Sequence, residues 1–488
     1  MSPETERYLT AAAVLLTYAA FCGLVLWRRR RKHSLAPIGG KTGNDPVLVA
    51  YASQTGFAEE VARRSAEALQ EGGVPARLAP LEALDGPALA KAGRAVFVIS
   101  TTGEGDAPDH ATRFVRRVMG ERAALEKLDY GLLALGDSSY ARYCAFGRQL
   151  DAWLQTQGAT PLFDRIEVDD GDGGALRHWQ YHLGKLTGGP AAPDWAPARF
   201  AEWRLVERHL LNPGSPGGPA YHLVLEPTEG GAEWQAGDIA EIGPRNARAA
   251  LDRFPPYFTE ALRDRMLPDD PAELAGASPE QARERLKPLP HREYSIASIP
   301  ADGRLELVVR QARHPDGRLG IGSGWLTEYA PIGSPIALRV RSNRSFHGPD
   351  GGRPMILIGN GTGIAGLRAH LRARAAGGRK DNWLVFGERT RAQDYLFRGE
   401  IEAWAAKGIL ARLDLAFSRD QERRLYVQDR LREAADTLRE WVAKGAAIYV
   451  CGSLEGMAAG VHAALLEALG QEELERLAED GRYRRDVY

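Results

Sequence analysis

The sequence predicts a multidomain α/β protein in which a β-rich domain stands between two strand–helix domains. Short apolar runs alternate with helical stretches over residues 46–186 and again over residues 353–488, as in parallel, doubly wound sheets. Residues 200–352 instead contain strand patterns typical of antiparallel pairing. The length of 488 residues agrees with this plan, because at roughly 100–200 residues per domain it predicts about three domains.

The composition excludes several classes of protein. Hydrophobic residues make up 44% of the chain and charged residues 26%, which excludes global disorder and a collagen-like repeat. The net charge of -1 argues against a nucleic-acid partner. The three cysteines, Cys22, Cys144 and Cys451, are too widely spaced for a disulfide framework or a Cys-based zinc site. We therefore predict no metal site.

The first element that we expect is a transmembrane helix with a basic flank in residues 1–33. Residues 8–27 contain no charged residue, and a helix of this length reaches about 30 Å, the thickness of a hydrocarbon core. Five basic residues follow at 28–32, which by the positive-inside rule predicts a single-pass protein of the inner (plasma) membrane with a cytoplasmic body. A buried soluble helix is the alternative. Residues 34–45 are expected to be a flexible tether.

In the first strand–helix domain, three strands end in polar loops, at residues 53–56, 100–106 and 135–140. Such loops meet at the carboxyl edge of a doubly wound sheet, where ligands bind. Hydroxyl and backbone N–H groups at a helix start suit a phosphate, and Tyr140 suits stacking on a ring system. Taken alone, each motif is equally an ordinary capped loop or a packing tyrosine.

The Pro/Ala/Gly-rich residues 187–199 are expected to form a linker, and one hypothesis is that it lets the first domain move. The β-rich domain after it contains a helical insert at 245–290. Alternation places Arg292 and Tyr294 on one face of a strand, where a guanidinium fork suits a diphosphate and a ring suits a planar cofactor. Residues 320–326, rich in glycine, suit a pyrophosphate at a helix start.

The last strand–helix domain has a glycine-rich turn, residues 359–366, between its first strand and helix. Such a turn lets a dinucleotide pyrophosphate approach a helix N-terminus. After a later strand come residues suited to the extra 2′-phosphate of NADPH: Ser418, Arg419, Arg424, Tyr426 and Gln428. A solvated basic helix face is the alternative.

The three loops of the first domain, "SQTG", "STTGEGD" and "LGDSSY", resemble the FMN loops of the flavodoxin family. The resemblance covers residues 46–186 and implies a flavodoxin-like domain in which Tyr140 stacks on the isoalloxazine. It implies a phosphate loop made of Ser53, Gln54, Thr55, Gly56 and Ala58. It implies further FMN contacts from Thr101, Thr102, Gly103, Gly105, Leu135, Gly136, Asp137 and Tyr143. Phe57 and Thr102 depart from the usual family residues.

The motifs "RxYS", "GxxS", "GTGIA", "SR…YVQ", "YVCG" and "DVY", in this order, are similar to the ferredoxin-NADP reductase module of the diflavin reductase family. The resemblance covers residues 200–488 and implies an antiparallel β-barrel FAD domain and a Rossmann-like NADPH domain. It implies FAD binding by Arg292, Tyr294, Ser295, Gly320, Gly322, Ser323 and Tyr488. It implies NADPH binding by Gly361, Thr362, Ser418, Arg419, Arg424, Tyr426 and Gln428. It implies a polar group around hydride transfer, formed by Ser295, Cys451 and Asp486, with Tyr488 covering the FAD ring.

Several features depart from the family pattern or stay open. Gly366 replaces the usual proline, and the insert at 245–290 is short for the family. Cys451 is equally explained as a small residue that closes a buried strand. Acidic residues near the FMN loops either steer a basic partner or are plain solvated surface: Asp106, Asp109, Asp169, Asp170 and Asp172.

The sequence therefore predicts a membrane-anchored NADPH-dependent diflavin oxidoreductase. We expect electrons to pass from NADPH to FAD to FMN and then to a one-electron acceptor, an unidentified haem protein or ferric complex. A sulfite or ferric-chelate reductase flavoprotein component is the alternative within the class. A flavin-binding membrane sensor without turnover is the alternative from another class.

Overall fold

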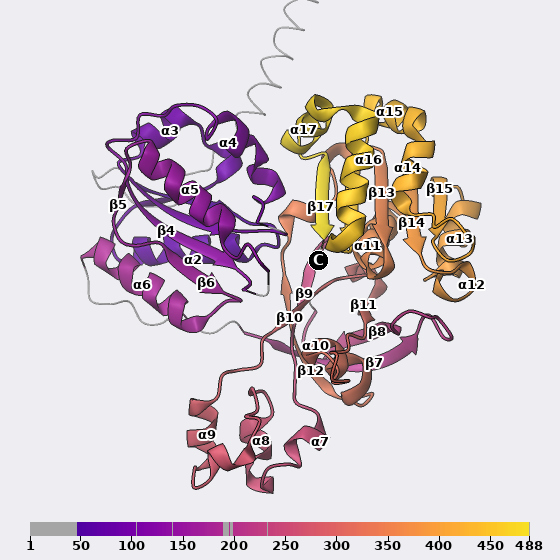
Figure 1. Ribbon diagram of the computed structural model, residues 1–488, viewed down its shortest axis with the longest axis horizontal. Coiled ribbons are helices and arrows are strands. Elements are labelled where there is room, and N and C mark those ends of the chain that lie inside the picture. Colours follow the sequence, from indigo (N-terminus) through magenta and orange to yellow (C-terminus); the bar gives the residue numbers. More distant parts are fainter. Residues whose placement is uncertain are drawn as a thin grey trace, which may run out of the picture.

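The computed structural model describes residues 46–487, apart from residues 104, 139, 189–194, 196–198 and 232. The described residues form three sheets, two of six strands and one of five. We call the parts that contain them the N-terminal module (residues 46–188), the barrel module (199–352) and the C-terminal module (353–487). Figure 1 shows the N-terminal module beside the other two, with the barrel module below the C-terminal module.

The N-terminal module is a parallel sheet with the order β2-β1-β3-β4-β5, and β6 pairs with β4 beyond this path. This is the flavodoxin-like doubly wound order. Its strands are β1 (Val47–Ala52), β2 (Ala76–Pro80), β3 (Arg94–Ser100), β4 (Asp129–Gly136), β5 (Thr160–Pro161) and β6 (Ile166–Asp169). Its helices are α2 (Phe57–Glu71), α3 (Gly86–Lys91), α4 (Thr112–Arg117), α5 (Ala145–Thr156) and α6 (Gly173–Thr187).

Helices cover both faces of this sheet. Apolar side chains of α2 and α6, among them Val61 and Trp179, pack on one face. Those of α3, α4 and α5, among them Phe114 and Leu150, pack on the other. Because both faces are buried, β1, β3 and β4 consist almost entirely of buried residues, which is why the sequence shows them as continuous apolar runs.

The barrel module is an antiparallel sheet with the order β10-β9-β12-β7-β8-β11. Its strands are β7 (Ala201–Leu210), β8 (Ala220–Pro227), β9 (Ile239–Gly243), β10 (Arg292–Ser295), β11 (Leu305–Arg310) and β12 (Pro335–Arg341). The two end strands meet through a bridge between Ile296 and Leu307, so the sheet curls back on itself around a buried core that includes Trp203 and Leu225. A short helix α10 (Ile321–Gly324) follows β11.

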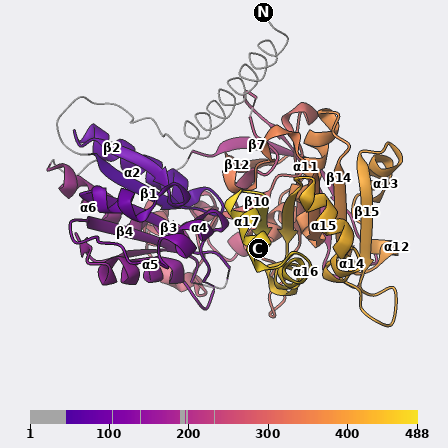
Figure 2. The same ribbon diagram turned by 90° about the horizontal axis from the view of Figure 1, so that it is seen from above.

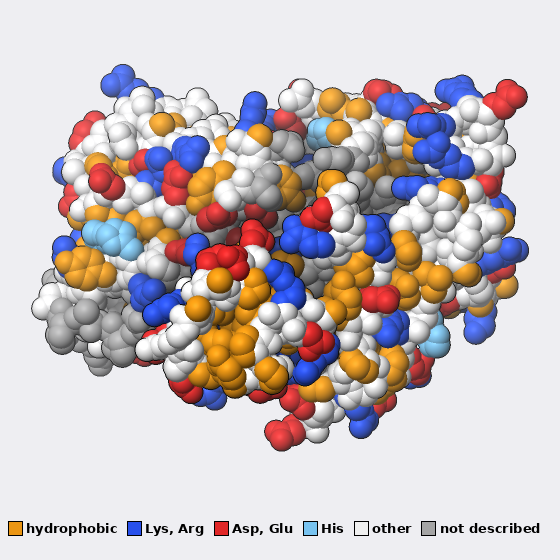
Figure 3. Space-filling view, turned by 60° about the horizontal axis from the view of Figure 1, so that its bottom comes forward, with side chains coloured by type: hydrophobic (Ala, Val, Ile, Leu, Met, Phe, Trp, Pro, Cys, Tyr) orange, Lys and Arg blue, Asp and Glu red, His pale blue; other side chains and the backbone are white. Residues whose placement is uncertain are grey.

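A small helical lobe projects from the barrel module, where the sequence predicts a helical insert. It contains α7 (Arg248–Leu251), α8 (Thr259–Leu262) and α9 (Pro279–Arg285). The lobe has its own small core around Phe258 and Leu262. Orange apolar side chains gather on it in Figure 3, and Tyr257 and Met266 are among its exposed ones.

The C-terminal module is a parallel sheet with the order β15-β14-β13-β16-β17. Its strands are β13 (Met355–Asn360), β14 (Asn382–Glu388), β15 (Leu410–Phe417), β16 (Ala447–Gly452) and β17 (Tyr483–Val487). Its helices are α11 (Ile364–Ala376), α12 (Arg391–Asp394), α13 (Arg398–Ala406), α14 (Val427–Glu433), α15 (Ala435–Ala443), α16 (Ala459–Leu469) and α17 (Gln471–Glu479). The sequence analysis missed β17, the edge strand. Figure 1 shows it on the side of the C-terminal module that faces the N-terminal module, and Figure 2 shows its neighbour α17 on that same side.

The predicted membrane anchor, residues 1–33, lies outside the described residues, as do the tether and most of the linker. Within the part of the chain that is described, no helix is both long enough and apolar enough to span a bilayer. The prediction of a single-pass inner-membrane protein is corrected on this finding. The membrane has no part in the function proposed below.

Candidate active site

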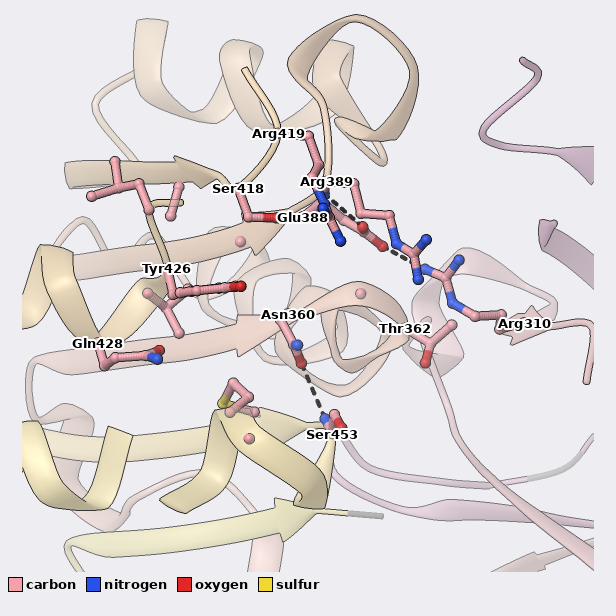
Figure 4. A pocket seen from close by; sticks show the side chains of 17 residues that line it. Arg310, Asn360, Thr362, Glu388, Arg389, Ser418, Arg419, Tyr426, Gln428 and Ser453 are labelled. Carbon is pink, nitrogen blue, oxygen red and sulfur yellow. Dashed lines mark hydrogen bonds and ion pairs between the residues drawn. The ribbon is translucent and has the colours of Figure 1, made fainter. Parts of the chain in front are cut away.

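A cavity of about 690 Å³ opens at the carboxyl edge of the C-terminal sheet (Figure 4). Five residues that the sequence assigns to NADPH line this cavity: Thr362, Ser418, Arg419, Tyr426 and Gln428. Gly361 lines it too, whereas Arg424 is exposed and is not among the lining residues. The structure thus brings together segments that are more than fifty residues apart in the chain.

The glycine-rich turn at the cavity floor requires its glycines. Gly361 has a φ of +54°, and a Cβ on Gly363 would stand 2.1 Å from the carbonyl oxygen of Cys451. The Asn360 side chain holds the turn, because its Oδ1 accepts the N–H of Ser453 at 3.0 Å. Bare backbone therefore faces the cavity where α11 begins, an arrangement that suits a pyrophosphate.

The sequence analysis missed an ion pair in the cavity wall. Arg310 donates to Glu388 and also to the carbonyl oxygen of Gly218 at 2.6 Å. Burial raises the pKa of Glu388, and the Arg310 charge opposes that rise. Figure 4 shows Arg310, Glu388 and Arg389 pointing toward one another. The only sequence signal for Arg310 was its position at the end of a strand.

These features fit an anionic dinucleotide. Three arginines and one carboxylate line the cavity, so its charge favours phosphate groups. The Oε1 atom of Gln428 is buried and has no hydrogen-bond partner among the described residues. An unsatisfied buried carboxamide oxygen is costly unless a ligand donates to it.

The three residues assigned to hydride transfer converge at the junction of the modules. Ser295 Oγ donates to Asp486 Oδ2 at 2.7 Å, and Cys451 Sγ donates to the same oxygen at 3.7 Å. Burial raises the pKa of Asp486, and it raises the pKa of the Cys451 thiol well above its usual range. The thiol is therefore protonated and serves as a donor. Tyr488, the fourth residue assigned here, lies outside the described residues.

The two segments assigned to FAD lie against each other. A Cβ on Gly322 would stand 2.7 Å from Cγ of Arg292 and 2.8 Å from the hydroxyl of Tyr294, so only glycine fits between them. The Ser323 hydroxyl accepts the N–H of Ala312 at 3.0 Å, which holds the Gly320–Ser323 loop in place. Burial raises the pKa of the Tyr294 phenol, which therefore stays neutral beside the predicted flavin.

The three loops assigned to FMN meet at one edge of the N-terminal sheet. In the first loop, Gly56 has a φ of +87° and the helix α2 begins directly after it. The Ser53 hydroxyl is buried and has no partner in the described part of the chain. This is expected of a hydroxyl that hydrogen-bonds to a phosphate when the ligand is bound. Ala58 is fully buried at the start of α2.

The second and third loops pack tightly onto α5 and the segment before it. Thr101 Oγ1 accepts the N–H of Phe146 at 3.2 Å, and Gly105 has a φ of +108°. A Cβ on Gly136 would stand 2.9 Å from the Tyr143 ring. Thr102 pairs with Asp106, and Gly103 has a φ of +50°. Leu135 is buried and Tyr140 is part-exposed. The remaining residue assigned to these loops is Asp137.

The edge that carries these loops faces the barrel and C-terminal modules, and two of the first loop's residues contact them. Thr55 Oγ1 accepts from Arg341 at 3.3 Å. The Gln54 carboxamide contacts Asp109 and the carbonyl oxygen of Arg485. The side chain of Gln54 thus makes contacts between modules, and the role of Gln54 at the FMN phosphate stays a prediction.

Most of the acidic residues near these loops have partners within the molecule. Asp109 pairs with Arg485, and Asp170 lies 3.6 Å from Arg292. Asp169 accepts from Ser138, and Asp172 caps α6 by accepting from Ala175. These contacts favour a structural role over the predicted steering of a partner.

Comparisons with known proteins agree with the geometry. Residues 49–179 match the flavodoxin family model, and residues 357–463 match the oxidoreductase NAD-binding domain. The sulfite reductase [NADPH] flavoprotein alpha-component of Vibrio cholerae serotype O1 is 30% identical, over 91% of this chain and 87% of the relative. The proteins of the same name in Neisseria meningitidis serogroup A and in a Shewanella species are 31% and 30% identical, over 91% and 93% of this chain and 89% and 91% of those relatives.

These matches cover nearly all of the described residues, so each of the three modules has a counterpart in the relatives. The chain is an NADPH-dependent flavoprotein oxidoreductase with FMN and FAD as its flavins. It belongs to the diflavin reductase family, together with the flavoprotein alpha-components of sulfite reductases.

Proposed function

We propose that this chain is the flavoprotein component of a sulfite reductase and supplies electrons from NADPH to a separate haem-containing component. The observation that carries the proposal is similarity to sulfite reductase flavoprotein alpha-components along almost the whole length of both chains. The sequence analysis gave this reading as its alternative, and the relatives favour it over the membrane-anchored main reading. They also argue against a sensor without turnover, because they are reductase components by name.

We assign NADPH to the cavity of the C-terminal module. Ser418 and Arg419 would hold the 2′-phosphate, and Thr362 and Arg310 would hold the pyrophosphate at the glycine-rich turn. When bound, the flavins separate the two electrons of a hydride so that they can leave singly. Ser295 and Cys451 donate to the Asp486 carboxylate and hold it at a defined position.

We assign FAD to the barrel module, against Arg292, Tyr294 and the glycine loop 320–323, and FMN to the three loops of the N-terminal module. On this assignment residues 46–186 would bind FMN, residues 200–352 would bind FAD and residues 353–488 would bind NADPH. The Ser53 hydroxyl and the backbone of residues 54–58 would hold the FMN phosphate, while Tyr140 would face the ring. The contacts between modules bring the FMN loops close to the end of β17, which also carries Asp486.

The test is reconstitution of sulfite reduction. The flavin-loaded chain is mixed with the haemoprotein component of a sulfite reductase, and NADPH oxidation is followed with and without sulfite. We expect oxidation that depends on sulfite and on both components and that yields sulfide. Rapid reduction of ferric citrate, with no sulfite-dependent turnover, would instead support the ferric-chelate alternative and contradict this proposal.

A further inference from the structure

The edge strand β17 carries two different contacts on its two sides. Asp486 lies on one side and accepts from Ser295. The preceding residue, Arg485, reaches out of the C-terminal module to Asp109 in the N-terminal module. Successive side chains of a strand point to opposite sides, so one short strand joins the hydride site to the module assigned to FMN.

Two residues of the N-terminal module bind the side chain, the N–H and the carbonyl of Arg485. Its Nε donates to Asp109 Oδ1 at 2.9 Å, and its Nη2 donates to the same oxygen. Its backbone N–H donates to Asp109 Oδ2 at 3.0 Å. Gln54 Nε2 donates to the carbonyl oxygen of Arg485 at 2.6 Å, and Gln54 Oε1 accepts the N–H of Asp109 at 3.0 Å. The three residues form a closed network.

This network also completes the sheet. One edge of β17 pairs with β16, which leaves the backbone groups of its other edge without strand partners. Asp109 and Gln54 satisfy the N–H and the C=O of Arg485 at that edge. Unpaired backbone groups are costly when buried away from water. In the docked position, Asp109 and Gln54 therefore take the place of water at this edge, while the pairing of β17 with β16 does not depend on docking.

The Arg485–Asp109 pair is better shielded than most ion pairs between the modules. The side chains of Arg485 and Asp109 are 26% and 12% exposed, and the Asp109 charge raises the pKa of Arg485. Arg344, which pairs with Glu59 across the same junction, is 72% exposed. Exposed pairs contribute little, since water and salt screen them.

We propose that Arg485 is a positioning residue that holds the N-terminal module in the docked position in which electrons pass between the two flavins. The proposal rests on the function proposed above. Asp109 and Gln54 are its receptors in the N-terminal module. Loss of the Arg485 charge leaves the cavity and the Asp486 contacts in place, but it weakens docking and slows electron transfer out of the barrel and C-terminal modules.

The test compares flavin-loaded wild type with Arg485→Met, Asp109→Asn and the control Arg344→Met. The control removes the same charge from an exposed pair at the same junction. Small-angle X-ray scattering reports docking without any turnover. We expect an expanded particle for Arg485→Met and Asp109→Asn at low salt, and a wild-type profile for Arg344→Met.

The kinetic readout separates docking from hydride transfer. Ferricyanide reduction from FAD should stay within about twofold of wild type in all variants. Cytochrome c reduction through FMN should fall by about tenfold or more in the two latch variants, Arg485→Met and Asp109→Asn, as for close charge pairs at interfaces. Wild-type scattering and cytochrome c rates in both latch variants would overturn the proposal. If the wild type fails to oxidise NADPH, the proposed function fails, while the scattering result still decides whether Arg485 governs docking.

Discussion

Asp486 is the residue on which the hydride site depends most, because both of its neighbouring donors aim at one of its oxygens. Replacement by Asn keeps the shape but removes the charge that orients them. We expect Asp486→Asn to lower kcat/KM for NADPH-driven ferricyanide reduction by about 10²-fold, the lower end for a positioned acid–base group. The control is Asp480→Asn, an exposed carboxylate near the same end of the chain. Equal rates for both variants would refute the role of Asp486.

Arg419 and Arg424 test whether the cavity, rather than the surface beside it, binds the 2′-phosphate of NADPH. Arg419 lines the cavity, whereas Arg424 does not. A hydrogen bond to a charged phosphate contributes about 1.5–3 kcal/mol, so Arg419→Leu should raise KM for NADPH by about 10- to 100-fold and leave KM for NADH nearly unchanged. Arg424→Leu should have a much smaller effect. The measurement is initial-rate kinetics with both nucleotides, and a larger effect at Arg424 would contradict the placement of the 2′-phosphate.

The carboxylate of Glu241 makes the stability of the fold depend on pH, and it is not one of the residues assigned to hydride transfer. Burial alone would raise its pKa, but hydrogen bonds from His291 and Arg339 outweigh burial and lower the pKa to about 2. A depressed carboxylate pKa stabilises the fold above the unfolded pKa of about 4.3, and this stability is lost as the pH falls through the folded value.

We therefore expect wild type to be more stable than Glu241→Gln by roughly 2–3 kcal/mol at pH 7, and the difference to shrink between about pH 4.5 and pH 2. Urea denaturation at stepped pH measures both numbers. Glu226→Gln is the control, since Glu226 and its partner Arg204 are exposed. A difference that grows on acidification would have the wrong sign.

Among the secondary-structure elements, helix α11 and strand β11 are joined by a buried ion pair. Arg368 donates to Glu306, and their side chains are 4% and 7% exposed. Removing one partner of a buried pair typically costs about 3–5 kcal/mol, because the other charge is left unpaired. Arg368→Met should destabilise the fold by about that amount in chemical denaturation. Arg398→Met, in an exposed i,i+4 pair with Glu402, should cost less than about 1 kcal/mol.

The strands that the sequence predicts are those buried on both faces, such as β13 and β16, whose residues are almost all apolar. Strand β17 escaped prediction because its sequence, "YRRDV", has charges at three of five positions. Those charges have partners far away in the chain: Arg485 pairs with Asp109 across 376 residues. No local pattern signals such a contact.

At the scale of the whole molecule, the motifs predicted which loops meet, because the carboxyl ends of parallel strands share one edge. The sequence could not show how the three modules face one another. That arrangement depends on side-chain pairs such as Arg339 with Glu60, which bind residues of different modules. It also gives the Gln54 side chain contacts with Asp109 and Arg485 that the loop motif alone does not signal.

In the proposed function, electrons enter through the C-terminal and barrel modules and leave through the N-terminal module. The most direct test is to strip FMN from the purified protein while FAD stays bound, and then to measure two NADPH-driven activities. We expect ferricyanide reduction to persist and reduction of the haemoprotein component to be lost until FMN is restored. If the FMN-free protein still reduces the haemoprotein component at the full rate, the claim is wrong.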